Sequence, residues 1–369
     1  MSDDLSRTSL FTWHADNGGR MVPFSGWEMP VQYPTGPLEE HHITRRSAGL
    51  FDIDHMGQIE VSGPDAEAYL NRVVTWDIST MSDYDAHYAL LCREDGGVLD
   101  DLFIYKLPQR WLVVVNAGNR QKDFAWMVGQ IDTFQVNVED ISDETYMLAL
   151  QGPKAINLLN QLTDVDLNVV PRFTAIEAQV NDTATLIGRT GYTGEDGVEL
   201  FFPAQSALTL WEAILSAGPA NEIEVAPIGL AARDSLRFEP SFPLYGHEIT
   251  EEITPLEANL RWACSWNKEF IGRASLLAQK EAGIPRKIVG LTMTEKGVPR
   301  EGYPVLDGDG QEVGVVVSGM YAPTVDQYCA HALVQRSSAK VGTGLQVQIR
   351  KNTRAAVVTK RPFYKPAYR

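Results

Sequence analysis

Residues 189–200, RTGYTGEDGVEL, hold the densest set of groups that could bind a ligand, with three carboxylates beside threonine and tyrosine hydroxyls. The runs on either side, residues 184–188 and 198–202, are rich in β-forming residues. The Gly-Glu-Asp-Gly centre between them favours a hairpin. In the second strand Glu199 points to the opposite face from its neighbours. An isolated glutamate of this kind is usually solvated, so a plain surface hairpin remains the alternative to a binding site.

A second chemical feature is the adjacent carboxylate pair Asp100 and Asp101, which lies in the β-rich residues 99–105. Neighbouring residues of a strand face opposite ways. Only one of the two carboxylates can therefore point into a given cavity, and we expect the other to face solvent or to complete a turn. Taken alone, such a pair after two glycines is typical of a turn at the start of a strand.

Other motifs accompany these two features. In chain order they are GRMVPFSGWEMP at 19–30, DHMG at 54–57, GGVLDDL at 96–102, VNAGN at 115–119, GLAARDSLR at 229–237 and RPFYKP at 361–366. Together with residues 189–200, the set closely resembles the aminomethyltransferase of the glycine cleavage system, the T-protein. The resemblance runs from about Arg7 to the last residue. The DHMG motif differs from the family's commoner SHMG, and we expect Asp54 to be structural.

The resemblance implies a role for eight residues. Asp101, the second of the pair, would be the essential catalytic carboxylate, which orients the pterin and assists proton movement at a folate nitrogen. Glu199 would accept hydrogen bonds from the pterin, and Arg233 would donate to its carbonyl or to a glutamyl carboxylate. The other folate contacts would be Met56, Tyr88, Asn116, Tyr192 and Tyr368, the last of which closes the site.

Structural roles compete with some of these assignments. Arg233 could instead form a salt bridge on its own helix, where Asp234 is its neighbour. Met56 and Tyr88 lie in runs where such residues usually belong to the hydrophobic core. The order of the motifs, rather than any one of them, favours the ligand-binding reading.

The implied reaction moves the aminomethyl carbon from the lipoyl arm of H-protein to tetrahydrofolate, a co-substrate, and releases ammonia and 5,10-methylenetetrahydrofolate. The alternative is a tetrahydrofolate-dependent demethylase acting on a small S-, O- or N-methyl donor. The intact FSGWEMP and RTGYTGEDG runs favour the T-protein. Folate-binding iron–sulfur assembly factors are a third class, but residues 268–273, KEFIGR, lack the cysteine of their motif.

The composition of the chain limits the class of protein, its expected cofactors and its expected location. The chain has 369 residues, 44% of them hydrophobic, and a net charge of −16, which argues against general nucleic-acid binding. Its three cysteines are widely spaced and predict buried thiols rather than disulfides. None of the seven histidines has the spacing of a metal motif, so no metal is expected. The sequence shows no membrane span, signal or transit peptide, and we expect a cytoplasmic protein.

The pattern of elements predicts an α+β fold. Strands are expected at 57–62, 111–116 and 146–150, and helices at 64–74, 120–131, 152–162, 207–215 and 228–238. Residues 279–286 resemble a linker, and short β runs after it predict a small barrel. We therefore expect a folate-binding domain over 1–278 and a C-terminal β-barrel domain over 286–369. The resemblance adds that the first part is two intertwined lobes, which with the barrel form three lobes around a central cavity.

The end of the chain differs in charge from the rest. Residues 350–369 contain seven Lys or Arg and no Asp or Glu. Such a cluster could dock an anionic partner, either an acidic face of H-protein or the polyglutamate tail of folate, or it could be an ordinary solvated face. Its members are Arg350, Lys351, Arg354, Lys360, Arg361, Lys365 and Arg369.

Overall fold

The computed structural model describes residues 5–366, and these fall into two compact units. The first unit contains the chain up to Tyr69, Ile78–Tyr88 and Leu102–Leu236. The second contains Leu70–Asp77, Ala89–Asp101 and the chain from Arg237 onward. The chain therefore passes between the units several times, and strands and helices are mixed in an α+β fold, as predicted.

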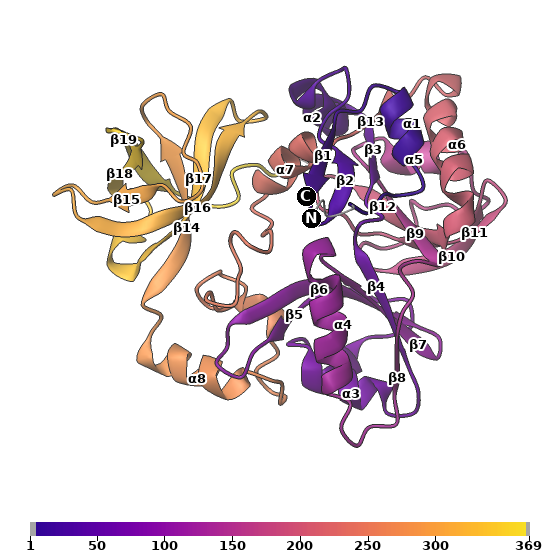
Figure 1. Ribbon diagram of the computed structural model, residues 1–369, viewed down its shortest axis with the longest axis horizontal. Coiled ribbons are helices and arrows are strands. Elements are labelled where there is room, and N and C mark those ends of the chain that lie inside the picture. Colours follow the sequence, from indigo (N-terminus) through magenta and orange to yellow (C-terminus); the bar gives the residue numbers. More distant parts are fainter. Residues whose placement is uncertain (1–4, 367–369) are drawn as a thin grey trace. The chain divides into compact units, whose positions relative to one another are not determined.

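A six-stranded sheet forms the centre of the first unit (Figure 1). Along β9 the residues alternate, so that Leu148 and Leu150 pack against helices α5 and α6 while Met147 and Ala149 face the other way. Both faces are buried, which explains the continuous apolar run of β9. In order across the sheet, the strands are β10 (Ala175–Val180), β11 (Thr183–Gly188), β12 (Gly197–Pro203), β9 (Thr145–Gln151), β3 (Ala48–Asp52) and β13 (Val225–Pro227).

A five-stranded sheet packs its apolar side chains against the second face of the first sheet. Leu112 and Val114 share one core with Met147 and Phe201, which come from the six-stranded sheet. The polar residues of that face, Glu199 among them, therefore lie between two layers of strands rather than at the surface. In order across the sheet, the strands are β5 (Ala86–Cys92), β6 (Val98–Leu107), β7 (Arg110–Val115), β4 (Gly57–Ser62) and β8 (Asn137–Asp140).

The predicted hairpin is confirmed: β11 and β12 pair antiparallel, with Gly188 opposite Glu199, and residues 189–196 join them. A smaller hairpin, β1 (Met21–Phe24) and β2 (Trp27–Pro30), lies near the N-terminus. The helices are α1 (Phe11–Asp16), α2 (Pro37–Arg46), α3 (Ala66–Val73), α4 (Arg120–Gly129), α5 (Ala155–Leu159), α6 (Ala207–Ala220), α7 (Leu230–Phe238) and α8 (Arg273–Ala282).

The five predicted helices are present, but their bounds differ from the prediction, and α6 continues to Ala220 rather than ending at residue 215. Helix α5 ends at Leu159 rather than at residue 162, because the Asn160 side chain accepts a hydrogen bond from the Leu167 backbone (3.0 Å) and turns the chain. The predicted linker at 279–286 is wrong in its first half. Helix α8 continues to Ala282, with Leu276 fully buried, and ends at Gly283, whose φ of 87° closes the helix.

The second unit contains a closed barrel, drawn in orange to yellow in Figure 1. The DGDG sequence at 307–310 is typical of a turn, and the Asp307 carboxylate accepts hydrogen bonds from the backbone of Asp309 and Gln311 at 2.9 Å each. In order around the barrel, the strands are β14 (Arg286–Met293), β17 (Gln327–Gln335), β16 (Glu312–Ala322), β15 (Pro304–Leu306), β18 (Gly344–Ile349) and β19 (Asn352–Thr359).

The cysteines are as predicted, since Cys92, Cys264 and Cys329 are buried free thiols. Among residues 5–366, no helix combines the length and the hydropathy that crossing a bilayer would take. Over the same residues, no group of His, Cys, Asp or Glu is placed to hold a metal ion.

Candidate functional site

Glu199 is a buried carboxylate with one oxygen left for a ligand. It is 9% exposed, and its Oε2 accepts from the hydroxyls of Thr190 (2.5 Å) and Tyr105 (3.2 Å). Within the described part of the chain, Oε1 accepts no hydrogen bond. Burial raises the pKa of Glu199, while the hydrogen bond from Thr190 and the charge on Arg233 oppose the rise. This is not the solvated glutamate of a surface hairpin.

Arg233, on helix α7, lies beside this carboxylate and under an aromatic ring. Its guanidinium carbon is 4.9 Å from the centroid of the Tyr192 ring, a cation–π distance. Burial lowers the pKa of Arg233, and its electrostatic interactions with Tyr192 and Glu199 oppose that effect. An arginine nevertheless stays protonated. Its guanidinium donates no hydrogen bond to any of residues 5–366, so its donors are available to a ligand.

The loop that contains Met56 is also part of this region. His55 is fully buried and packs edge-on against Phe24, at 5.6 Å between ring centroids. Burial and the nearby charge of Arg233 lower the pKa of His55 to about 3, so the ring is neutral. Gly57 pairs with Val115 across β4 and β7, which places Met56 and Asn116 at the same end of two neighbouring strands.

An aromatic series links Tyr88 to the Glu199 carboxylate. The Tyr88 ring contacts Phe103 edge-on at 6.2 Å, and Phe103 lies 6.1 Å from Tyr105, whose hydroxyl binds Glu199. The first unit therefore brings together Tyr192, Glu199 and Arg233, with Tyr88 connected through two rings.

The two adjacent aspartates lie in the second unit, at the end where β6 passes into the first. Asp101 is partly exposed, whereas Asp100 is fully buried. The expectation that the other carboxylate faces solvent is therefore wrong for Asp100. By strand alternation Asp101 shares a face of β6 with Phe103 and Tyr105. Tyr368 lies outside the described residues.

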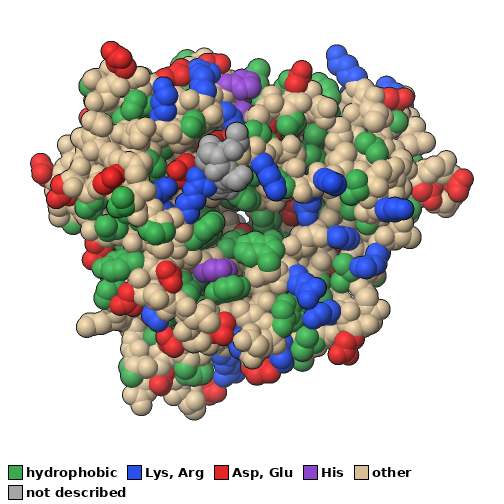
Figure 2. Space-filling view, turned by 180° about the vertical axis from the view of Figure 1, so that it is seen from behind, with side chains coloured by type: hydrophobic (Ala, Val, Ile, Leu, Met, Phe, Trp, Pro, Cys, Tyr) green, Lys and Arg blue, Asp and Glu red, His purple; other side chains and the backbone are tan. Residues whose placement is uncertain are grey.

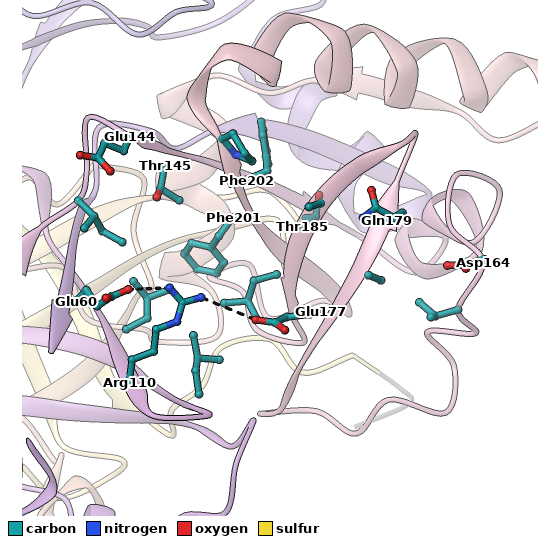
Figure 3. Close-up of a pocket in the computed structure, with 18 residues that line it drawn as sticks. Glu60, Arg110, Glu144, Thr145, Asp164, Glu177, Gln179, Thr185, Phe201 and Phe202 are labelled. Carbon is teal, nitrogen blue, oxygen red and sulfur yellow. Dashed lines mark hydrogen bonds and ion pairs between the residues drawn. The ribbon is translucent and has the colours of Figure 1, made fainter. Parts of the chain in front are cut away.

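A groove in the first unit is separate from these residues. It has a volume of about 760 Å³, and none of the predicted site residues lines it. Figure 3 shows Arg110 between Glu60 and Glu177, at 2.7 and 3.8 Å between nitrogen and oxygen. These side chains are partly exposed, so the ion pairs contribute little stability. We do not assign the ligand site to this groove.

Sequence reasoning missed Tyr105, Gln151 and Arg45 as parts of the site. Tyr105 could have been found, because it lies four residues after Asp101 on one strand and therefore on the same face. Gln151 binds the carbonyls of Thr190 and Val198, and no local pattern indicates that contact.

Asp54 provides a prediction about stability. Burial and the charge of Asp52 raise the pKa of Asp54 to about 9, while its Oδ1 accepts from the Met147 backbone (3.1 Å). The folded state thus holds a proton that the unfolded chain loses near pH 4, so stability falls as pH rises from about 4 to about 9. Asp54→Asn cannot ionise, and we expect it to be more stable than wild type by about 1–3 kcal/mol at pH 8.

Urea unfolding of both proteins at pH 5, 7 and 8 measures this effect. The advantage of the asparagine variant should shrink toward pH 4, and a difference that is constant across pH would show that Asp54 is already ionised in the folded state.

Comparison with known proteins supports the resemblance along nearly the whole chain. Residues 10–268 match the GCVT N-terminal domain, and residues 286–365 match the glycine cleavage T-protein C-terminal barrel domain. Aminomethyltransferases from Moorella thermoacetica and Desulforamulus reducens are 47% and 45% identical, each over 98% of this chain and 98% and 99% of their own.

A solved structure gives the same result. The crystal structure of the glycine cleavage system aminomethyltransferase T from Bartonella henselae aligns with a TM-score of 0.92 and 35% identity, over 98% of this chain and 99% of that one. By sequence over its whole length and by fold, this chain belongs to the glycine cleavage T-protein family.

Proposed function

We propose that this protein transfers the aminomethyl carbon from the lipoyl arm of H-protein to tetrahydrofolate. In this reaction the carbon loses its bonds to sulfur and to the amino nitrogen and gains bonds to two folate nitrogens. The products are ammonia, the dihydrolipoyl arm and 5,10-methylenetetrahydrofolate. The family to which the chain belongs and the polar groups of the first unit support this proposal.

The observation that carries the proposal is the unused hydrogen-bonding capacity beside the Tyr192 ring. Glu199 Oε1 and the Arg233 guanidinium have no hydrogen-bond partners within residues 5–366. A pterin edge presents adjacent N–H donors and a carbonyl acceptor, so it fits a buried carboxylate next to a guanidinium. Leaving such groups unpaired would be costly, which favours a ligand of this chemistry.

The proposed site residues have separate roles in folate binding and in proton transfer. Glu199 accepts from the pterin's donors and Arg233 donates to its acceptor, which fixes the ring in one orientation. Met56, Tyr88, Asn116 and Tyr192 are proposed as further folate contacts, with Tyr368 as the closing residue. Asp101 accepts or returns a proton at the reacting nitrogen. Positioning supplies most of the rate enhancement, because it makes the carbon transfer effectively unimolecular.

We also propose the protein partner, the cellular location and the functional domains for this reaction. Lipoylated H-protein is the protein partner, the location is cytoplasmic, and the functional domains are 1–278 and 286–369. These assignments follow from the family and are consistent with the buried free thiols of Cys92, Cys264 and Cys329.

One assay tests the function. Purified protein is mixed with aminomethylated H-protein and tetrahydrofolate, and ammonia and methylenetetrahydrofolate are measured, beside parallel reactions with small S-, O- and N-methyl donors. We expect both products to form when aminomethylated H-protein is the donor, and neither to form with the small methyl donors. Methyl transfer from a small donor without activity on H-protein would instead identify a demethylase.

The basic cluster gives a prediction about encounter with anionic partners. Arg350 and Lys351 lie in the exposed turn between β18 and β19, and Arg354 follows on β19. Lys and Arg side chains also gather over the barrel on the right of Figure 2. Arg361 does not belong to this surface, because it is largely buried near Glu248, and Arg369 lies outside the described residues.

Reversing Lys351 and Arg354 to Glu is expected to raise the apparent KM for H-protein or for polyglutamylated folate at low salt and to leave kcat unchanged. The effect should disappear as salt rises, because exposed charges are screened over about 8–10 Å at physiological ionic strength. Lys340→Glu, an exposed lysine of the second unit outside the cluster, is the control. If the apparent KM values of variant and wild type depended on salt in the same way, the basic cluster would be only a solvated face.

A further inference from the structure

Arg45 is a buried arginine of α2 that the proposed ligand contacts do not explain. Its side chain is 6% exposed, and its Nη1 lies 2.9 Å from Oε1 of Glu195, which is 1% exposed. The same nitrogen donates to the Thr193 carbonyl (2.7 Å), and Nη2 donates to the Leu236 carbonyl (3.1 Å). One guanidinium therefore joins the glycine-rich loop to the last turn of α7.

Each segment that Arg45 joins contains one member of the Tyr192–Arg233 pair. Tyr192 directly precedes Thr193, and Arg233 is about one helical turn before Leu236. The contact between the ring and the guanidinium, at 4.9 Å, depends on how the loop lies against the helix. Arg45 fixes the position of the loop against α7, because it donates hydrogen bonds to the backbone carbonyls of Thr193 and Leu236.

The other side of the loop is held by Gln151, the last residue of β9. Its Nε2 donates to the Thr190 and Val198 carbonyls (3.1 Å each), and its Oε1 accepts from the Thr193 hydroxyl (3.0 Å). A Cβ at Gly191 would lie 1.9 Å from that oxygen, so this close approach requires glycine. Gln151 thus ties the loop to β9, and Arg45 ties it to α7.

We propose that Arg45 is a positioning residue, which sets the distance between Tyr192 and Arg233 and thereby the affinity for tetrahydrofolate without taking part in the chemical step. This inference rests on the proposed function, since it requires that Arg233 binds folate. The planar fork of the guanidinium is needed, because the single ammonium of a lysine cannot bond to the carboxylate and to both carbonyls in this arrangement.

The test compares two adjacent arginines. Arg45→Met combined with Glu195→Gln removes both buried charges, so that neither is left unpaired. Arg46→Met is the matched control, because Arg46 is 45% exposed and pairs with Glu39 and Glu224 at the surface (2.6 Å each). Arg45→Lys keeps the positive charge and removes only the fork. Calorimetry gives the Kd for tetrahydrofolate, and steady-state kinetics give kcat and both KM values.

The double variant and Arg45→Lys are expected to bind tetrahydrofolate roughly 5–30-fold more weakly. Their kcat should stay within about threefold and their KM for H-protein should not change, whereas Arg46→Met should match wild type. An unchanged Kd in both Arg45 variants, or parallel losses in every parameter with a lowered folded fraction, would make Arg45 merely structural. A wild-type protein that does not bind tetrahydrofolate would instead overturn the proposed function itself.

Discussion

Asp101→Asn is expected to lower kcat by about 10²–10⁴-fold, the usual contribution of a general acid or base. The substitution keeps the shape of the side chain and removes its ability to take up a proton at neutral pH. Asp101 is partly exposed, so the folded state should tolerate the change. Single-turnover measurements with aminomethylated H-protein, together with a thermal melt, separate the chemical step from stability.

Asp100→Asn is the matched control, and the burial of Asp100 means that this variant should affect stability rather than turnover. Asp100 is fully buried and faces away from Asp101 across the strand. We expect a lower Tm, since an amide does not reproduce the interactions of a fully buried carboxylate. Turnover per folded molecule should be almost unaffected. Equal losses of kcat in folded protein at both positions would contradict the assignment of one face of β6 to catalysis.

The strands of the site could be predicted because their signals are local. Alternation and the Gly-Glu-Asp-Gly turn were enough to place Glu199 opposite its neighbours on β12. The same reasoning could not tell that Glu199 and Asp100 are buried. Alternation says which residues share a face, but burial depends on a second layer of structure, and for Glu199 that layer is the five-stranded sheet.

Contacts between distant parts of the chain could not be predicted. Arg45 lies 148 residues before Thr193, and Gln151 lies 39 residues before Thr190, so neither contact leaves a local pattern. The early end of α5 has the same cause on a shorter scale, since it depends on a hydrogen bond between Asn160 and Leu167. Such tertiary contacts override local propensity.

Removing the polar groups that we assign to the pterin is the other change with a large expected effect. Glu199→Gln and Arg233→Ala should each weaken tetrahydrofolate binding by about 1–3 kcal/mol, because each leaves a polar edge of the ligand without its partner. The KM for H-protein should not change. Glu199→Gln should not destabilise the fold, since it removes a carboxylate whose burial is already unfavourable, as its raised pKa indicates.

The affinity should also depend on pH in a defined direction. Ionised Glu199 accepts from the ligand and its protonated form does so less well, so binding should weaken as pH falls through a pKa that lies above the ordinary carboxyl value. Glu199→Gln should abolish this dependence. Glu177→Gln, on the same sheet but 53% exposed, is the control and should bind as wild type does. Unchanged calorimetric affinity in both Glu199→Gln and Arg233→Ala would show that these residues are structural, and that the pterin binds elsewhere.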